Sequence, residues 1–219
     1  MSELKIGFVG LGDQGAPMAE AISDAGFELH VWARRDQSFD AISGVKYLRH
    51  DSLESLAVMV DVLSLCLRDD EDIWNLIRQH RLIEALRSGS IVVNHGTGDP
   101  TENEHIGAFL AESGIKYLDA PVSGGRPGAV SRTLTTLVGG DANDFARCRE
   151  VFETFSRKVA HMGTWGAGST RSEQCVLKGA MLFRLWRGAN CCTMFATRFV
   201  ARSADCNGNS LAILNRRRL

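Results

Sequence analysis

The chain has 219 residues and a formal net charge of −1, with 44% hydrophobic and 23% charged side chains. This length is sufficient for one sizeable hydrophobic core. The near-neutral charge argues against nucleic acid or an anionic membrane as the partner of the whole molecule. No charged and then apolar leader precedes the first apolar segment, and no apolar run reaches the roughly 18 residues of a membrane span. We therefore expect a cytoplasmic protein.

Charge and cysteine are distributed unevenly along the chain. Residues 166–219 contain nine Lys and Arg against two acidic residues, so this tail carries +7 while the rest of the chain carries −8. Four of the six cysteines also lie in the tail, without the Cys-x-x-Cys or His-rich spacing of a metal site. The composition therefore predicts no metal centre and a change of character near residue 165.

Residues 5–18 read KIGFVGLGDQGAPM, in which an apolar run is followed directly by glycines in G-x-G-x-x-G spacing. A helix is expected at residues 16–25. In a dinucleotide-binding turn Gly10 makes the tight turn, Gly12 lets the backbone approach a pyrophosphate, and Gly15 lets the helix pack on the strand. The phosphates would face the N–H groups at the start of the helix. A glycine turn of no special function is the alternative, and the strand before and helix after the motif favour the nucleotide site.

Further strand and helix patterns alternate through about residue 165. Strands are expected at residues 28–32, 60–67, 90–93, 115–118, 134–138 and 158–161. Helices are expected at residues 53–58, 70–86, 101–113 and 143–155, the third of them opened by a capping box of Thr101 and Glu104. This alternation predicts an α/β fold, a Rossmann-type doubly wound and mostly parallel sheet. Its ligands would bind beyond the carboxyl ends of the strands.

The end of the second strand indicates which dinucleotide is bound. Folds that bind NAD usually place Asp or Glu about 20 residues past the glycines, whereas NADP requires a cation for its 2′-phosphate. Here the strand ends in Trp32-Ala33-Arg34-Arg35, without an acid. Guanidinium groups suit bidentate contact with a phosphate. The sequence therefore favours NADP, and a solvated basic turn is the alternative.

Two loops after later strands carry polar groups suited to a small ligand. In the loop at residues 94–100, which starts Asn94-His95, hydroxyl and amide groups could meet a nicotinamide or a substrate. In the loop at residues 119–125, the hydroxyl of Ser123 stands beside the N–H groups of Gly124 and Gly125. Such a group of donors could bind a small carboxylate. A plain loop shaped by Gly and Pro is the alternative for the second loop.

Together, these motifs make the chain resemble the 3-hydroxyisobutyrate dehydrogenase family, also called the β-hydroxyacid dehydrogenases. They cover about three-quarters of the chain in the family's order. The matching stretches are GFVGLG-x-x-G-x-PM at residues 7–18, Thr97 and Pro100, DAPVSGG at 119–125, Gly128-Ala129, TLT-x-x-VGG at 133–140 and HMG-x-x-GAG at 161–168.

The resemblance implies that residues 1–165 form an NADP-binding Rossmann domain, with NAD as a possible cofactor. It implies a small carboxylate substrate, bound by Ser123, Gly124 and Gly125. Family members are expected to form oligomers, and the unmatched tail weakens that expectation here. The residues implied to contact the cofactor are Gly10, Leu11, Gly12, Gly15, Arg34, Arg35, Leu67 and Thr97.

The resemblance ends after Gly168. The family carries its catalytic Lys four positions beyond this glycine, where the present chain has Ser172, and Cys175-Val176 stands where Asn is expected. Arg171 and Lys178 are the nearest cations. We expect residues 166–219 to be an aberrant remnant in place of the family's all-helical C-terminal domain, arising from a shifted reading frame, an alternative exon or a sequence error. No catalytic residue is therefore predicted.

Two functions of different classes follow from these observations. The first is an NADP-dependent oxidoreductase that transfers hydride between nicotinamide and a small hydroxy acid or semialdehyde. The second is an NADP-binding module with little or no turnover, because the family Lys and helical domain are missing. A DNA-binding function for the basic tail is a distant third, since its arginines follow no known motif. A lysine at the family's position would distinguish the first two.

Overall fold

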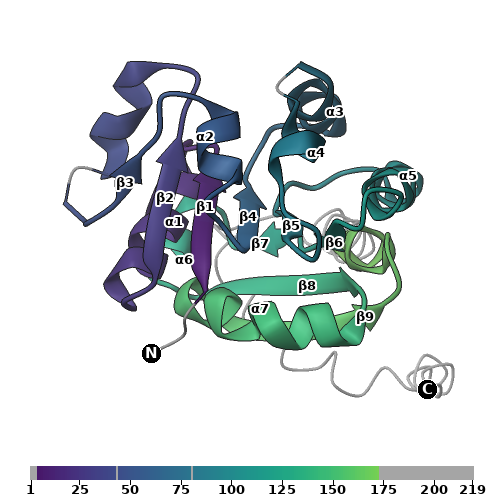
Figure 1. Ribbon diagram of the computed structural model, residues 1–219. Helices are drawn as coiled ribbons and strands as arrows, with labels where there is room; N and C mark the ends of the chain where they lie inside the picture. The colour runs from purple at the N-terminus through teal and green to yellow at the C-terminus, as the bar shows by residue number, and fades with distance from the viewer. Residues whose placement is uncertain (1–3, 43, 80, 173–219) are drawn as a thin grey trace, which may run out of the picture. The chain divides into compact units, whose positions relative to one another are not determined.

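The computed structural model describes residues 4–42, 44–79 and 81–172 of the chain. These residues form one mixed sheet with the strand order β3-β2-β1-β4-β5-β6-β8-β7, and β9 pairs with β8 (Figure 1). The parallel strands are β1 (Lys5–Val9), β2 (Glu28–Trp32), β3 (Leu48–Arg49), β4 (Val62–Leu65), β5 (Ile91–Asn94) and β6 (Lys116–Asp119). β8 (Leu134–Gly140) runs antiparallel to β6 and to β7 (Val122–Ser123), and parallel to β9 (Ser156–Gly163). The order 3-2-1-4-5-6 is that of dinucleotide-binding folds, so the predicted doubly wound, mostly parallel sheet is confirmed.

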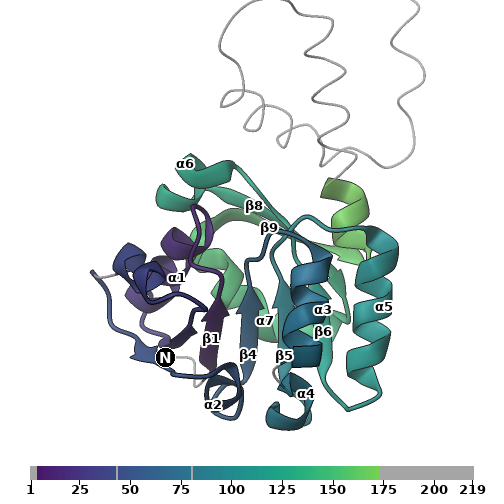
Figure 2. The ribbon, with the colours of Figure 1, turned by 90° about the horizontal axis from the view of Figure 1, so that it is seen from above.

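Helices cover both faces of this sheet (Figure 2). One face carries α1 (Gly15–Asp24), α6 (Gly125–Val130) and α7 (Ala142–Phe155). The other carries α2 (Leu53–Ala57), α3 (Asp70–Gln79), α4 (Leu82–Ala85) and α5 (Pro100–Ala111). A 3-10 helix, η1 (Asp36–Ile42), follows β2. The crossovers leave the carboxyl ends of β1, β2, β4 and β5 at one edge, where a ligand of such a fold binds.

The hydrophobic core consists of two clusters, one on each face of the sheet. Ile6 and Phe8 of β1 belong to the cluster under α1 and α7, whereas Val9 belongs to the one under α2 to α5. All three are almost fully buried. Burial of an aliphatic or aromatic side chain is worth about 1.5–3 kcal/mol. Because both faces are covered, the parallel strands are apolar almost throughout, as the sequence showed.

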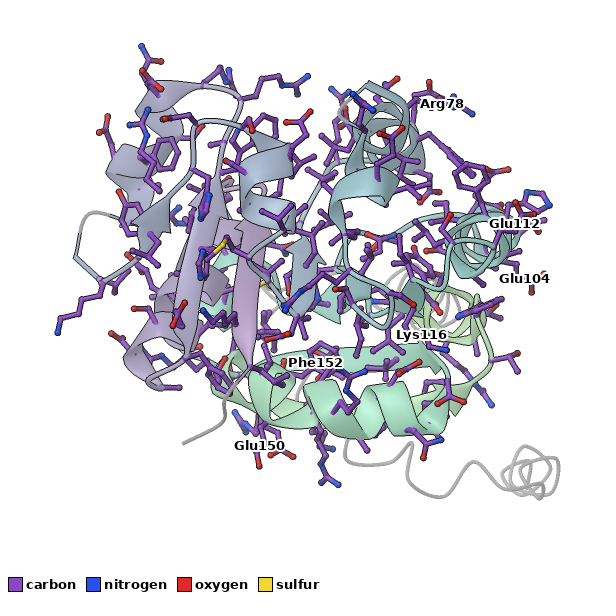
Figure 3. The ribbon with its side chains drawn as sticks, in the orientation of Figure 1. Arg78, Glu104, Glu112, Lys116, Glu150 and Phe152 are labelled. Carbon is purple, nitrogen blue, oxygen red and sulfur yellow. The ribbon has the colours of Figure 1, made fainter. Side chains whose placement is uncertain are left out.

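Helix α7 shows how sequence periodicity sets the packing. Cys148, Val151, Phe152 and Phe155 recur at helical spacing and are fully buried against the sheet. Figure 3 shows Phe152 on the sheet side of the helix and Glu150 on the opposite side.

Two helix predictions require correction. The expected helix at residues 70–86 is divided into α3 and α4, because Arg81 adopts a left-handed conformation with φ of 43°. The pieces still bury their apolar residues in one cluster, so the periodicity was real although the helix was not continuous. The capping box of Thr101 and Glu104 was wrong. Asp99 caps α5 instead, accepting bonds from the N–H groups of Thr101 and Glu102 at 2.8 and 3.2 Å, with Pro100 as the first helical residue.

After β9 the described chain continues into a helical turn at residues 167–172. Ser169 and Ser172 are buried in this turn. Cys175, Val176 and Lys178 lie outside the described residues. The expected boundary at residue 165 and the expected nature of residues 166–219 therefore stay predictions.

Candidate cofactor and substrate site

The three glycines of the first turn occupy three different environments. Gly10 has φ of 103°, and a β-carbon there would collide with the carbonyl oxygen of Cys66. A β-carbon on Gly15 would collide with the carbonyl oxygen of Gly10, so the first turn of α1 lies close against the end of β1. A β-carbon on Gly12 would meet nothing within 4 Å. The turn is thus closely packed behind Gly10 and Gly15 and open at Gly12, which fits the approach of a ligand to the backbone.

A pocket of about 210 Å³ lies at the carboxyl ends of β1, β2 and β4. It brings together most of the residues that the sequence assigned to the cofactor. Those that line it are Gly10, Leu11, Gly12, Arg34, Arg35 and Leu67. Gly15 and Thr97 are not among the lining residues. Gly15 packs against the backbone of Gly10 and so supports the turn without lining the pocket, and Thr97 is exposed in the loop after β5.

Part of the pocket is lined by α3, a helix that the sequence predicted within residues 70–86 without assigning it to the cofactor. Asp72, Asn75 and Leu76 of α3 line the pocket together with the strand-end residues. Their spacing of three and four residues places them on one face of the helix. The sequence did offer a signal for these residues, since Asp72 and Asn75 are polar and lie on a helix shortly after Leu67. The helical period alone could not show which face of that helix lines the pocket.

The region after β2 presents positive rather than negative charge to this pocket. Arg34 and Arg35 are both exposed and line it, as does Ser38. The first carboxylate after the strand is Asp36, which accepts a hydrogen bond from Nη2 of Arg49 at 2.7 Å and is not a lining residue. No described carboxylate from the turn after β2 therefore takes the place of a ribose-binding acid.

Asn94 and His95 are placed differently from the sequence expectation. Oδ1 of Asn94 accepts a bond from the N–H of Gly96 at 2.8 Å, and its Nδ2 donates to Oδ1 of Asn103 at 3.1 Å. His95 lies under the sheet with Nδ1 3.2 Å from the carbonyl oxygen of Ala120, and burial lowers its pKa to about 4. Both side chains are at most 2% exposed. Both side chains therefore stabilise the loop from within the protein, and the side-chain amide of Asn94 is not available to a ligand as the sequence had suggested for the amide groups of this loop.

The loop implied to bind the substrate joins the cofactor turn at the same edge. Ser123 and Gly124 are exposed at the start of α6. Gly124 and Gly125 have φ of 133° and 60°, values that favour glycine. Nη1 of Arg126 lies 3.4 Å from Oδ1 of Asp13, which belongs to the glycine turn. The structure therefore brings the two loops side by side, although each follows a different strand.

Comparison with known proteins agrees with this geometry. The sequence profile described as the NAD binding domain of 6-phosphogluconate dehydrogenase matches residues 5–163. The chain belongs to this family. The match also confirms the resemblance of the N-terminal part to the 3-hydroxyisobutyrate dehydrogenases, one of which, from Drosophila melanogaster, is 30% identical over 74% of the chain.

Several relatives of this NAD-binding domain are dehydrogenases or reductases by name. A protein of Pseudomonas aeruginosa named NAD-dependent L-serine dehydrogenase is 34% identical over 75% of the chain, and one of Escherichia coli named 2-hydroxy-3-oxopropionate reductase is 30% identical over 76%. The chain spans only 55% and 57% of these two relatives. A solved structure titled Mycobacterium tuberculosis 3-hydroxyisobutyrate dehydrogenase with L-serine is 25% identical, with a TM-score of 0.75, covering 97% of this chain and 74% of that one.

Other potential reactive groups in this NAD-binding domain are partly or fully buried. Burial raises the pKa of the Cys66 thiol, beside the glycine turn, to about 11, so it is not a ready nucleophile. Ser172, which the sequence resemblance matched to the family's Lys, is 7% exposed in the last described turn, and its equivalence to that Lys stays a prediction. Among the described residues, no group of three or more His, Cys, Asp and Glu could hold a metal ion. None of the helices within this part of the chain is long and apolar enough to cross a membrane.

Proposed function

We propose that this domain binds NADP(H) in the pocket at the carboxyl ends of β1, β2 and β4, and prefers it to NAD(H). One observation carries the proposal: Arg34 and Arg35 line the same pocket as Gly10 and Gly12. The open backbone at Gly12 would receive the pyrophosphate, and the two guanidinium groups would bind the 2′-phosphate of the adenosine ribose. Leu11 and Leu67 would provide apolar contacts for the bound dinucleotide.

The reaction that we propose for this family of domains, when the catalytic group is present, is hydride transfer between the cofactor and a small hydroxy acid or its semialdehyde. NADP would supply the hydride chemistry when bound. Ser123, Gly124 and Gly125 would bind the substrate carboxylate through one hydroxyl and two N–H groups, and Thr97 would lie by the nicotinamide end. The substrates in the names of the relatives support this class, since serine and 2-hydroxy-3-oxopropionate each carry a hydroxyl and a carboxylate.

A second candidate function is cofactor binding without turnover. Ser172 favours it, because an uncharged hydroxyl replaces the lysine that the family uses as its proton-transfer group. The pocket of this chain does not depend on residue 172, which is not among its lining residues. Binding can therefore persist where the chemistry is lost.

Two measurements separate these functions. Calorimetric titration of the full chain with NADP⁺ and NAD⁺ tests binding, and we expect the tighter binding with NADP⁺. A turnover assay with NADP⁺ and a panel of 3-hydroxy acids then tests the chemistry. Failure to bind either dinucleotide would refute both functions, whereas binding without turnover would select the second.

A further inference from the structure

Asp119, the last residue of β6, has a carboxylate with an unusual set of partners. Its side chain is fully buried, and it forms no ion pair with any described residue. The backbone N–H of Gly166 donates to Oδ1 at 3.0 Å, and that of Ser169 donates to Oδ2 at 2.9 Å. The carboxylate at the carboxyl end of β6 therefore binds the first turn of the helix that follows β9.

Two motif glycines that the cofactor pocket does not explain leave room for this carboxylate. A β-carbon on Gly139 would collide with Oδ1 of Asp119. A β-carbon on Gly168 would lie 2.8 Å from Oδ2 of Asp119 and 2.5 Å from the carbonyl oxygen of Leu137, closer than real contacts allow. These glycines belong to the VGG and GAG stretches. The conformation of three separate segments is thus arranged around one carboxylate.

The same turn has further bonds to β6 and to α5. Nε1 of Trp165 donates to the carbonyl oxygen of Tyr117 at 3.0 Å. Nδ2 of Asn103 donates to the hydroxyl oxygen of Ser169 at 3.3 Å. Ser169 is therefore held through its backbone by Asp119 and through its side chain by α5, which fixes both the position and the rotation of the turn.

A helix cap of this kind is costly compared with an ordinary one. Asp141 caps α7 in the same way, accepting bonds from the N–H groups of Asn143 and Asp144, but it does so in solvent, and these bonds lower its pKa. Burial raises the pKa of Asp119 despite its two backbone donors. A buried charge without a cation is a poor means of gaining stability. Its presence here indicates a role in placing a segment.

We propose that Asp119 is a positioning residue whose carboxylate fixes the start of the helix at residues 167–172, and with it residue 172, relative to the substrate loop. Asp119 ends β6 and Ser123 ends β7, only four positions further along the chain, so one short segment carries both the cap of that helix and the predicted carboxylate site. The relevance of this placement to catalysis rests on the proposed function. The placement itself does not.

The test compares Asp119→Asn with Asp141→Asn in the full chain by amide hydrogen exchange. We expect Asp119→Asn to speed exchange at the Gly166 and Ser169 amides by about tenfold or more in total, since both bonds lose the charge of their acceptor and the NH2 group of Asn cannot accept one of them. NADP⁺ affinity should stay within about twofold, because Asp119 does not line the pocket. Asp141→Asn should affect only the first turn of α7. Unchanged exchange at Gly166 and Ser169 would overturn the proposal, as would an equal increase throughout the sheet.

A pH profile of the unmodified chain keeps the proposal testable if Asp119→Asn does not fold. Protonation of Asp119 removes the charge and converts one acceptor into a donor, so protection of the two amides should fall as the pH drops through its raised pKa. Other titratable groups packed around this segment are Tyr117, Glu104 of α5 and His161 of β9. Glu104→Gln and His161→Gln should leave the profile unchanged. A profile that disappears in either variant, or protection that is independent of pH, would contradict the proposal.

Discussion

A β-carbon on Gly10 would collide with the carbonyl oxygen of Cys66, whereas one on Gly12 would meet nothing. Gly10→Ala should therefore lower the free energy of unfolding by about 2 kcal/mol or more, because it adds both a collision and an unfavourable φ. Gly12→Ala should preserve stability and weaken NADP⁺ binding, since only a bound ligand would meet the new methyl group. Denaturant unfolding and calorimetry check the two expectations. Equal loss of stability in both variants would contradict the distinction.

The two arginines after β2 give a second prediction. Arg34→Ala and Arg35→Ala should weaken NADP⁺ binding by about tenfold or more each, in line with roughly 1.5–3 kcal/mol for a hydrogen bond to a charged group. NAD⁺ binding should change little, because NAD lacks the 2′-phosphate. Calorimetric titration of both cofactors measures the effect, with Arg157→Ala on the exposed part of β9 as a control. If both cofactors lose affinity equally, the arginines do not select the phosphate.

The fold was predictable because its determinants are local. Short apolar runs identify most of the strands, and apolar residues at helical spacing identify most of the helices. The G-x-G-x-x-G motif places β1 and α1 on either side of its turn. The short β3 was not predicted, since two exposed residues, Leu48 and Arg49, carry no periodic signal. The break at Arg81 was also missed, because apolar spacing continues across it.

The site residues were predictable only where they lie at or just after the ends of predicted strands. Strand-end residues such as Arg34 and Leu67 meet in the pocket because parallel strands end at one edge. The roles of Asn75 and Asp119 could not be predicted, because they depend on tertiary structure. Asn75 lines the pocket from α3, and the carboxylate of Asp119 accepts a bond from Ser169, 50 residues further along the chain. Asn94 likewise lies at the carboxyl end of a strand, as the last residue of β5, but its side chain is buried and bonded to Asn103, which no local pattern predicts.

His95 gives a third prediction, on the pH dependence of stability. Burial lowers its pKa in the folded state to about 4, whereas the unfolded chain takes up the proton near pH 6.5. Stability should therefore be fully present above about pH 6.5 and decline as the pH falls toward 4, with a slope of up to about 1.4 kcal/mol per pH unit from this residue. Unfolding free energies of the unmodified chain and of His95→Gln across this range isolate the contribution. A difference between them that does not vary with pH would contradict it.

The fourth prediction concerns residue 172 and the chemistry itself. Hydride loss from an alcohol leaves a proton on oxygen, and removing it by a positioned base is typically worth about 10²–10⁴-fold. The buried hydroxyl of Ser172 carries no charge and is a poor base near neutral pH. We therefore expect little or no turnover from the unmodified chain, together with intact NADP⁺ binding.

Ser172→Lys should raise turnover by at least about 10²-fold, because burial lowers the pKa of a lysine toward neutrality and makes it a better base. Thr170→Lys, in the same helical turn, provides the matched control and should gain nothing. The measurement is NADP⁺ reduction with a panel of 3-hydroxy acids, each variant first shown to bind the cofactor. Family-level turnover by the unmodified chain would contradict the assignment. Arg171→Ala and Lys178→Ala would then show whether a neighbouring cation supplies the missing group, since loss of turnover in one of them would identify the residue that replaces the lysine.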